Sequence, residues 1–275
     1  MYRKNLSGQT TFCSFIPTPL AEIQVIHTAR MDNLIMEVEK AIRDWDTSSA
    51  SLSDQQIQQL VRQEAEYSCR LASDKVSSPF AVMMGAEPET DEDTENLIQA
   101  ISYAFVATEE LPLSTRLLKN CHYLMCKSER YDKKYPGELR HSPVWIGKKG
   151  CTLNQALFVP PVYEDMNDAL SELEHYMNDE NPEHVLIRAA LIHYQFETIH
   201  PFIDANGRTG RLLNLLYLLE NGVIHQPTLK WSEFLWRYRD RYYMELQHVH
   251  ETDIYEDWIL FFLTSLKGAA QEGII

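Results

Sequence analysis

A segment of twelve residues in the C-terminal half of the chain carries side chains suited to phosphate chemistry. It runs from His200 to Arg211 and reads His-Pro-Phe-Ile-Asp-Ala-Asn-Gly-Arg-Thr-Gly-Arg. His200 offers an imidazole whose ordinary pKa of about 6.5 lets it accept a proton at neutral pH. Asp204 offers the carboxylate oxygens that Mg²⁺ prefers, and Arg208 and Arg211 would share one face of a helix. The combination predicts a site that handles a nucleotide polyphosphate.

Two apolar segments flank these residues and predict helices that are buried on all sides. Residues 185–199 are apolar around almost the whole helical circumference, and residues 212–219 are nearly continuous leucine and tyrosine. Pro201 disfavours the helical conformation at the residue before it, so the first helix should end there. The pair Asn206-Gly207 is able to turn with positive φ, and the second helix should begin near Gly207 or Arg208.

The start of this second helix is a natural place for an anion. The first N–H groups of a helix have no partners within it and point at whatever precedes the helix. Two arginines in a first turn oppose the helix dipole by roughly 0.3–1 kcal/mol each, so their presence indicates an anionic ligand that offsets this cost.

The same twelve residues resemble the signature of the Fic (filamentation induced by cAMP) family. That signature fixes His-Pro-Phe, an acidic residue, Gly or Ala, Asn-Gly-Arg and a further Arg, and this sequence fills every fixed position. The resemblance runs from about Phe15 to about Ala270. It implies a mainly α fold, a Fic-type helical bundle with a small β-hairpin flap over the active site and an N-terminal helical region. We divide the chain accordingly into an N-terminal arm and helical region, 1–95, and a Fic catalytic core, 96–275.

The resemblance also implies a reaction, the transfer of AMP from ATP to a hydroxyl group of a target protein with pyrophosphate leaving. His200 would be the general base that takes the proton from a Ser, Thr or Tyr side chain. Asp204 would hold Mg²⁺ bridging the α- and β-phosphates. The groups that would bind the phosphates are Asn206, the Gly207 amide, Arg208 at the β-phosphate and Arg211 at the γ-phosphate.

Residues 142–161 resemble the flap of the family. Two short β-prone runs separated by a Gly/Lys/Asn loop predict a small hairpin here. In the family the flap aligns the backbone of the target protein by strand addition. The residues expected to dock the target are Trp145, Ile146 and Gly147, although simple hairpin packing would explain Trp145 and Ile146 equally well.

A later segment resembles the part of the family that borders the adenine. It contains Tyr242 and Tyr243, which without the resemblance would be assigned to the core. Seven residues after the second tyrosine, His250 stands where the family leads us to expect a pocket Asn.

One departure from the family concerns regulation. Many Fic proteins carry an inhibitory helix in which a glutamate, four residues after a Ser or Thr, pairs with the second arginine of the signature. The matching stretch here begins at Ser68, and Ala72 stands in the place of the glutamate. We therefore predict that the usual intramolecular lock is absent. Glu64 or Glu66 would substitute only if the helix were shifted, and control by oligomerisation or a partner chain stays open.

The composition limits the classes of function. A formal net charge of -15 argues against a general binder of nucleic acid or of an anionic membrane, and no stretch is long and apolar enough for a membrane span. Five cysteines without metal-ligand spacing indicate free thiols and a cytoplasmic protein. The partners we expect are ATP, Mg²⁺ and a protein target with a hydroxyl side chain, and a homodimer stays open.

Outside the signature, apolar periodicity predicts further helices. Their expected ranges are 22–45, 51–71 with Ser53 and Gln56 at its start, 95–108, 113–129 with Ser114 as cap, 231–249, and 254–270 with Trp258, Phe261 and Phe262 facing the core. Asn221-Gly222 is expected to end a helix. Residues 1–20 are interpreted as an irregular arm and residues 72–93 as a solvated loop.

Three alternative functions stay open. A Fic-fold transferase could use another nucleotide or phosphate donor, although relatives that phosphorylate their targets have lysine where this chain has Gly207. A metal hydrolase is suggested by His193, Glu197 and His200, which fall at helical spacing but lack the adjacent His-Glu of a zincin. A catalytically silent interaction module is the third, but such a module has no evident need for an intact His200 and both arginines.

Overall fold

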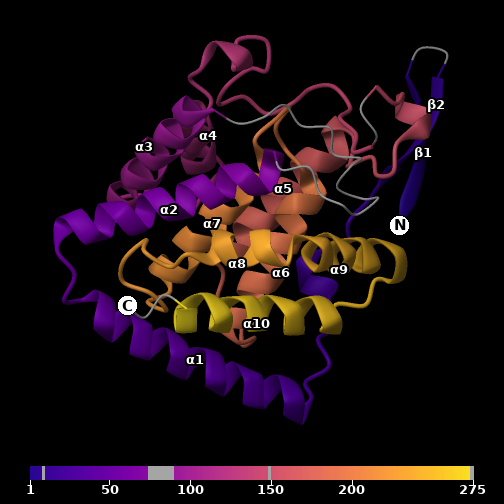
Figure 1. Cartoon of the computed structure of the whole chain (residues 1–275). Coiled ribbons are helices and arrows are strands. Elements are labelled where there is room, and N and C mark those ends of the chain that lie inside the picture. The colour runs from indigo at the N-terminus through magenta and orange to yellow at the C-terminus, as the bar shows by residue number, and fades with distance from the viewer. Residues whose placement is uncertain (8–9, 74–89, 148–149, 273–275) are drawn as a thin grey trace.

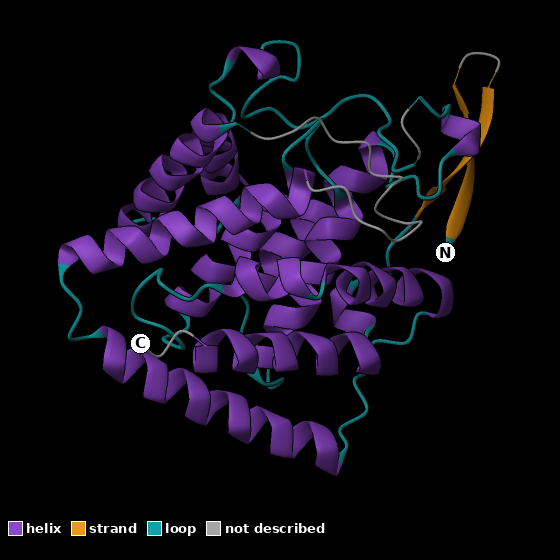
Figure 2. Ribbon diagram, in the orientation of Figure 1, coloured by secondary structure: helices purple, strands orange, loops and turns teal. Residues whose placement is uncertain are grey.

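The computed structural model of the chain describes residues 1–7, 10–73, 90–147 and 150–272. These residues form a bundle of helices with one two-stranded β-hairpin at its edge (Figure 2), so the predicted mainly α fold class is confirmed. The strands are β1 (Tyr2–Ser7) and β2 (Thr10–Phe15). The helices are α1 (Ala29–Ser49), α2 (Asp54–Ser73), α3 (Asp91–Ala107), α4 (Thr115–Met125), α5 (Tyr163–Asn178), α6 (Val185–Ile199), α7 (Asn206–Glu220), α8 (Trp231–Arg237), α9 (Arg239–Thr252) and α10 (Glu256–Glu272).

Helices α6 and α7 lie at the centre of the bundle, with the other helices around them (Figure 1). Every residue of α6 except Val185 and Glu197 is buried, and α7 is buried continuously from Arg208 to Leu218. A helix that is apolar on all sides is stable only when other elements cover all of it. The two predicted buried helices are therefore confirmed, and they place the segment between them inside the bundle.

The N-terminal helices share one hydrophobic core with the rest of the chain. Helix α1 packs along α10, and α2 packs against α8, α3 and α7 (Figure 1). The buried cluster includes Trp45 of α1 and Trp258, Phe261 and Phe262 of α10, as the periodicity predicts for these last three. Helix α2 thus reaches the signature segment through α7, while the division at residue 95 stays a prediction.

The interpretation of residues 1–20 as an irregular arm is wrong. Strands β1 and β2 pair antiparallel with Tyr2 opposite Phe15, and the buried residues Phe12 and Ser14 alternate with exposed Thr11 and Cys13. This period of two is the alternation of a strand, which a search for helical periodicity does not detect. The backbone N–H of Phe15 donates to the carbonyl of Val159 at 2.8 Å, so the hairpin is joined to the segment that follows the flap.

The predicted flap hairpin is reduced, among the described residues, to a single antiparallel bridge between Ile146 and Phe158. The predicted solvated loop at 72–93 lies outside the described residues from 74 to 89. Its last residue, Asp93, is instead helical, because Thr90 and Asp93 form a capping box that starts α3.

The observed helix ends agree better with the capping residues in the sequence than with the limits of the apolar periodicity. Ser114 accepts from the N–H of Leu117 at 3.4 Å, and Ser53 and Gln56 bond one another at the start of α2, as predicted. Asn221 ends α7. The first long helix begins only at Ala29, because Thr28 is its cap, and the expected helix 231–249 is broken at Tyr238 into α8 and α9.

Candidate active site

A cavity of about 380 Å³ opens at the junction of α6 and α7. Its walls come from the end of α2, the residues after α4, the flap, the α6–α7 junction and α9. The cavity brings together every residue predicted for the site, namely Trp145, Ile146, Gly147, His200, Asp204, Asn206, Gly207, Arg208, Arg211, Tyr242 and Tyr243. It also contains Ala72, Arg130, Lys134 and Glu197.

His200 ends α6 in the left-handed conformation, with φ 51° and ψ 61°. Its Nδ1 lies 3.1 Å from the carbonyl oxygen of Glu197. Because a carbonyl only accepts, Nδ1 carries the proton and the lone pair of the neutral ring is on Nε2. Burial lowers the pKa of His200 to about 4, so the imidazole is neutral at neutral pH.

The turn that precedes α7 does not use the residues predicted for it. The positive φ angles belong to His200 and Ala205, at 51° and 59°, whereas α7 begins at Asn206. Pro201 disfavours right-handed helix at His200, which leaves the left-handed conformation as a way to end α6. The expectation of positive φ at Asn206-Gly207 is therefore wrong, although the predicted helix boundary is within two residues.

Arg140 holds the backbone of this turn through hydrogen bonds to its carbonyl groups. Its Nε donates to the carbonyl of His200 at 2.7 Å, and its Nη2 donates to the carbonyls of Ile199 at 3.1 Å and Pro161 at 2.7 Å. The side chain is buried, and burial lowers the pKa of Arg140 to about 10, which leaves it charged at neutral pH. Arg140 thereby satisfies carbonyl groups that have no partner within α6, a role that was not predicted for it.

Asn206 braces the loop from within. Its Oδ1 accepts from the N–H of Phe202 at 2.8 Å, and its Nδ2 donates to the carbonyl of the same residue at 2.9 Å. Phe202 is buried and stacks on His122 with ring centroids 3.9 Å apart. The Asn206 side chain therefore supports the shape of the loop, whereas the predicted phosphate contact would have to come from the N–H groups that begin α7.

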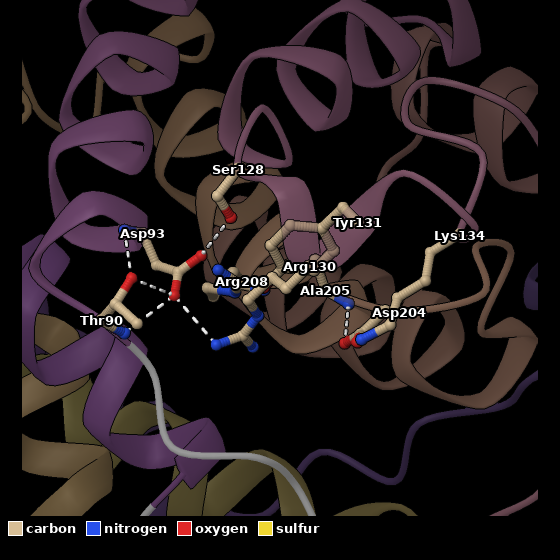
Figure 3. A network of polar contacts seen from close by, with 9 residues as sticks. All are labelled: Thr90, Asp93, Ser128, Arg130, Tyr131, Lys134, Asp204, Ala205 and Arg208. Atoms are coloured by element: carbon tan, nitrogen blue, oxygen red, sulfur yellow. Dashed lines mark hydrogen bonds and ion pairs between the residues drawn. The ribbon is translucent and has the colours of Figure 1, made fainter.

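The two arginines of the signature are held in different ways. Arg211 donates from Nε to the hydroxyl of Ser68 at 2.9 Å and from Nη2 to its carbonyl at 2.7 Å. Arg208 is buried and donates from Nη2 to the hydroxyl of Tyr131 at 2.6 Å (Figure 3). A Cβ added to Gly207 would lie 3.0 Å from Nη1 of Arg211, so glycine permits this close approach of the guanidinium to the start of α7.

Asp204 bears the carboxylate expected to hold Mg²⁺. One of its oxygens, Oδ1, accepts from the N–H of Ala205 at 2.6 Å, and Oδ2 lies 2.6 Å from Nζ of Lys134. Burial opposes ionisation, but the hydrogen bond and charge of Lys134 outweigh it and hold the pKa of Asp204 below its usual value. A single carboxylate fits Mg²⁺ that is bound mainly by the phosphates of a nucleotide.

Helix α9 contributes to the cavity wall the two tyrosines expected near the adenine. Tyr242 is buried and its hydroxyl lies 2.9 Å from Nε2 of His193, as in a core residue. Tyr243 donates from its hydroxyl to the carbonyl of Leu71, next to Ala72, at 3.1 Å. His250 does not line the cavity; it stacks on Phe158 with centroids 4.1 Å apart.

Glu197 is the second carboxyl group of the cavity, and the sequence presented it only as part of a metal hydrolase. Its Oε1 is buried and has no hydrogen-bond partner within the part of the chain that the structure describes. Burial raises the pKa of Glu197 to about 7, against the opposing charge of Arg211. No cluster of three or more His, Cys, Asp or Glu side chains suited to a metal occurs in residues 1–7, 10–73, 90–147 and 150–272, so nothing there favours the hydrolase.

The central part of the chain is similar to a known family of proteins. The Fic/DOC family model matches residues 112–218, which include the flap and the signature segment. The protein adenylyltransferase Fic of Drosophila grimshawi is 36% identical over 120 residues, which are 43% of this chain and 22% of that protein. A probable protein adenylyltransferase of Aquifex aeolicus is 27% identical over 168 residues, 60% of this chain and 49% of that protein. The match therefore spans half or less of the length of these relatives.

Solved structures agree on the fold. A Fic family protein from Desulfovibrio desulfuricans superposes with a TM-score of 0.71 at 20% identity, over 91% of this chain and 75% of that one. Fic-1 from C. elegans superposes with a TM-score of 0.59 at 18% identity, over 90% and 72%. The likeness covers about nine-tenths of this chain, and the chain has the Fic fold.

Proposed function

We propose that this protein is a protein adenylyltransferase, which transfers AMP from ATP to a Ser, Thr or Tyr hydroxyl of a target protein. The observation that carries the proposal is the convergence of His200, Asp204, Arg208, Arg211 and the start of α7 on one cavity. The relatives named adenylyltransferase support the same activity, although only part of their length is matched.

His200 is suited to the proton transfer. Because Nδ1 donates to the carbonyl of Glu197, Nε2 carries the lone pair that can accept a proton. The target oxygen attacks the α-phosphorus, its proton passes to Nε2, the new P–O bond forms, and the bond between the α-phosphorus and the oxygen leading to the β-phosphate breaks. Pyrophosphate leaves with the electrons of that bond.

The start of α7 is suited to the negative charge that develops on pyrophosphate. Its first N–H groups lack helical partners, and Arg208 and Arg211 add two guanidinium groups at the cavity. Asp204 would hold Mg²⁺, which supplies further neutralisation of the phosphates when bound. The role of Tyr242 and Tyr243 as the adenine border rests on their place in the cavity wall.

The flap is suited to holding the target protein. Trp145, Ile146 and Gly147 line the cavity, and the Trp145 side chain is held by a bond from Nε1 to the carbonyl of Cys151 at 3.1 Å while 43% of the residue stays exposed. These residues line the same cavity as His200, which supports their proposed role in pairing with an extended segment of the target.

We further propose that the usual lock is absent. Ser68 lies against Arg211 and Ala72 lines the cavity, so α2 is in the register predicted for an inhibitory helix but presents no carboxylate there. Glu64, one turn earlier than Ser68, is buried and accepts from the N–H of Ser232 at 2.9 Å, which commits it elsewhere. The helix is thus not shifted in the way that a substitute glutamate would require.

We also propose a cytoplasmic location. No disulfide joins the five cysteines, and none of the helices in the described ranges is long and apolar enough to cross a membrane.

Peptide mass spectrometry tests the proposal. The protein is incubated with ATP and Mg²⁺, alone and with a cell lysate, beside the variant His200→Ala. We expect AMP on a Ser, Thr or Tyr side chain with the wild type, and a loss of about 10²–10⁴-fold with the variant. A phosphate or a different nucleotide on the hydroxyl would instead favour a Fic-fold transferase with another donor.

A further inference from the structure

A short segment after α4 supplies the cavity with two cations that do not belong to the signature. It contains Arg130 and Lys134, which both line the cavity, and Tyr131, which is buried between them. The Tyr131 ring has the Arg130 guanidinium 4.8 Å from its centroid, the Lys134 ammonium at 5.0 Å and the Arg208 guanidinium at 5.5 Å. One aromatic ring therefore gathers three of the cations of the cavity (Figure 3).

Lys134 is placed more firmly than a surface lysine. Its backbone N–H donates to the carbonyl of Tyr131 at 2.7 Å, and its side chain is 29% exposed. Its ammonium lies 2.6 Å from Oδ2 of Asp204, whose side chain is 35% exposed (Figure 3). The position of the Lys134 ammonium is therefore set by three contacts: the backbone bond to Tyr131, the Tyr131 ring and the Asp204 carboxylate.

The two carboxylate oxygens of Asp204 have different hydrogen-bond partners. Oδ1 of Asp204 is bonded to the N–H of Ala205 within its own turn, whereas Oδ2 is bonded to Lys134, which also lines the cavity. Oδ2 is also the oxygen that a divalent cation would take, and Lys134 is bonded to it. An ammonium and a metal ion cannot both occupy the same contact on one oxygen.

We propose that Lys134 is the internal counterion of Asp204 and that it competes with a divalent cation for Oδ2. This inference rests on the proposed nucleotide site. While Lys134 neutralises Asp204, a triphosphate entering the cavity meets no bare carboxylate, so ATP binds without a metal ion. When a metal ion is bound to Asp204, the ammonium is displaced and the metal ion replaces its charge.

The test measures the dissociation constant of ATP by isothermal titration calorimetry, in EDTA and in saturating Mg²⁺, for the wild type and Lys134→Gln. In EDTA the variant should bind ATP about fivefold or more weakly, because Asp204 then repels the phosphates. In Mg²⁺ the variant should differ from the wild type by less than about twofold, because the metal ion has replaced Lys134 in both. Lys133→Gln, the exposed neighbour with the same change of charge, should match the wild type in both conditions.

A double variant separates the pair from each residue alone. Removing the negative charge with Asp204→Asn should restore metal-free binding of ATP in the Lys134→Gln background, because the repelling carboxylate is gone. Equal losses with and without Mg²⁺ would overturn the proposal and make Lys134 a plain phosphate ligand. No loss in EDTA would also overturn it. If the wild type binds no ATP under either condition, the nucleotide site itself fails, which is distinct from a failure of Lys134 at a site that binds.

Discussion

Arg211, the last residue of the signature, is bonded twice to Ser68 of α2, from Nε to the hydroxyl at 2.9 Å and from Nη2 to the carbonyl at 2.7 Å. Residues four apart on a helix lie on one face, so the side chain of Ala72 is on the same side of α2 as Ser68. Ala72 lines the cavity, and the helix therefore presents a methyl group at the place where a charged side chain would meet Arg211.

Installing a carboxylate at this place should inhibit the enzyme. We expect Ala72→Glu to pair with Arg211, to compete with the phosphates of ATP and to lower the rate of AMP transfer by about tenfold or more. Ala72→Gln introduces a side chain of nearly the same size as glutamate but without its charge. Its rate should stay within about twofold of the wild-type rate. The two variants are compared by initial rates at subsaturating ATP. Equal rates for both would show that residue 72 does not act on Arg211.

The pH dependence of the reaction should show no protonation of His200 near neutrality. Burial lowers the pKa of His200 to about 4, whereas an ordinary imidazole would lose half of its base form at about pH 6.5. The variant Glu197→Gln removes a second group of the cavity that titrates near neutral pH. In this background we expect kcat/KM to stay level as the pH falls from about 7 to about 6. An acid limb centred at about 6.5 in that background would contradict this.

Glu197 should make the folded protein less stable as the pH rises. Burial raises the pKa of Glu197 to about 7 from an ordinary 4.5, so the folded protein binds more protons than the unfolded chain between these values. The free energy of unfolding then declines as the pH rises through this window. Glu197→Gln cannot ionise and should show a smaller decline in urea unfolding at about pH 5 and pH 8.

A second glutamate provides a check on this sign. Burial also raises the pKa of Glu64 to about 7, and this carboxyl group should contribute a decline in the same direction. The double variant Glu64→Gln, Glu197→Gln should therefore have the flattest profile of the set. A single Glu197→Gln variant whose stability falls as steeply as that of the wild type would contradict the assignment.

Arg140 should be among the residues whose loss costs the fold most. Arg140→Met keeps the length of the side chain but leaves the carbonyls of Pro161, Ile199 and His200 without their donor. We expect a loss of about 2–4 kcal/mol in the free energy of urea unfolding. Arg116→Met on the exposed face of α4 is the matched control and should change stability by less than about 0.5 kcal/mol. Similar small effects of both variants would exclude Arg140 as the support of the turn.

The sequence identified the centre of the molecule well because local signals and burial coincide there. Continuous apolar character predicted α6 and α7, and Pro201 ended α6 at the residue where the structure ends it. The caps at Ser53 and Ser114 were predictable for the same reason, since each bonds to a residue three positions away.

Features that depend on distant partners could not be predicted in this way. Nothing near Arg140 in the sequence indicates that its guanidinium reaches carbonyls about sixty residues later. Lys134 likewise meets Asp204 seventy residues on. The hairpin of β1 and β2 has an alternation of buried and exposed residues around Phe12, which helical periodicity does not reveal.

ATP labelled at two different phosphates would show which group, if any, this cavity transfers. Purified wild type and His200→Ala are incubated with Mg²⁺ and a target lysate, once with α-labelled and once with γ-labelled ATP. We expect protein-bound label from the α-phosphate only, and loss of that label in His200→Ala. Label from the γ-phosphate, or α-label that persists without His200, would contradict the claim that this cavity transfers AMP through His200.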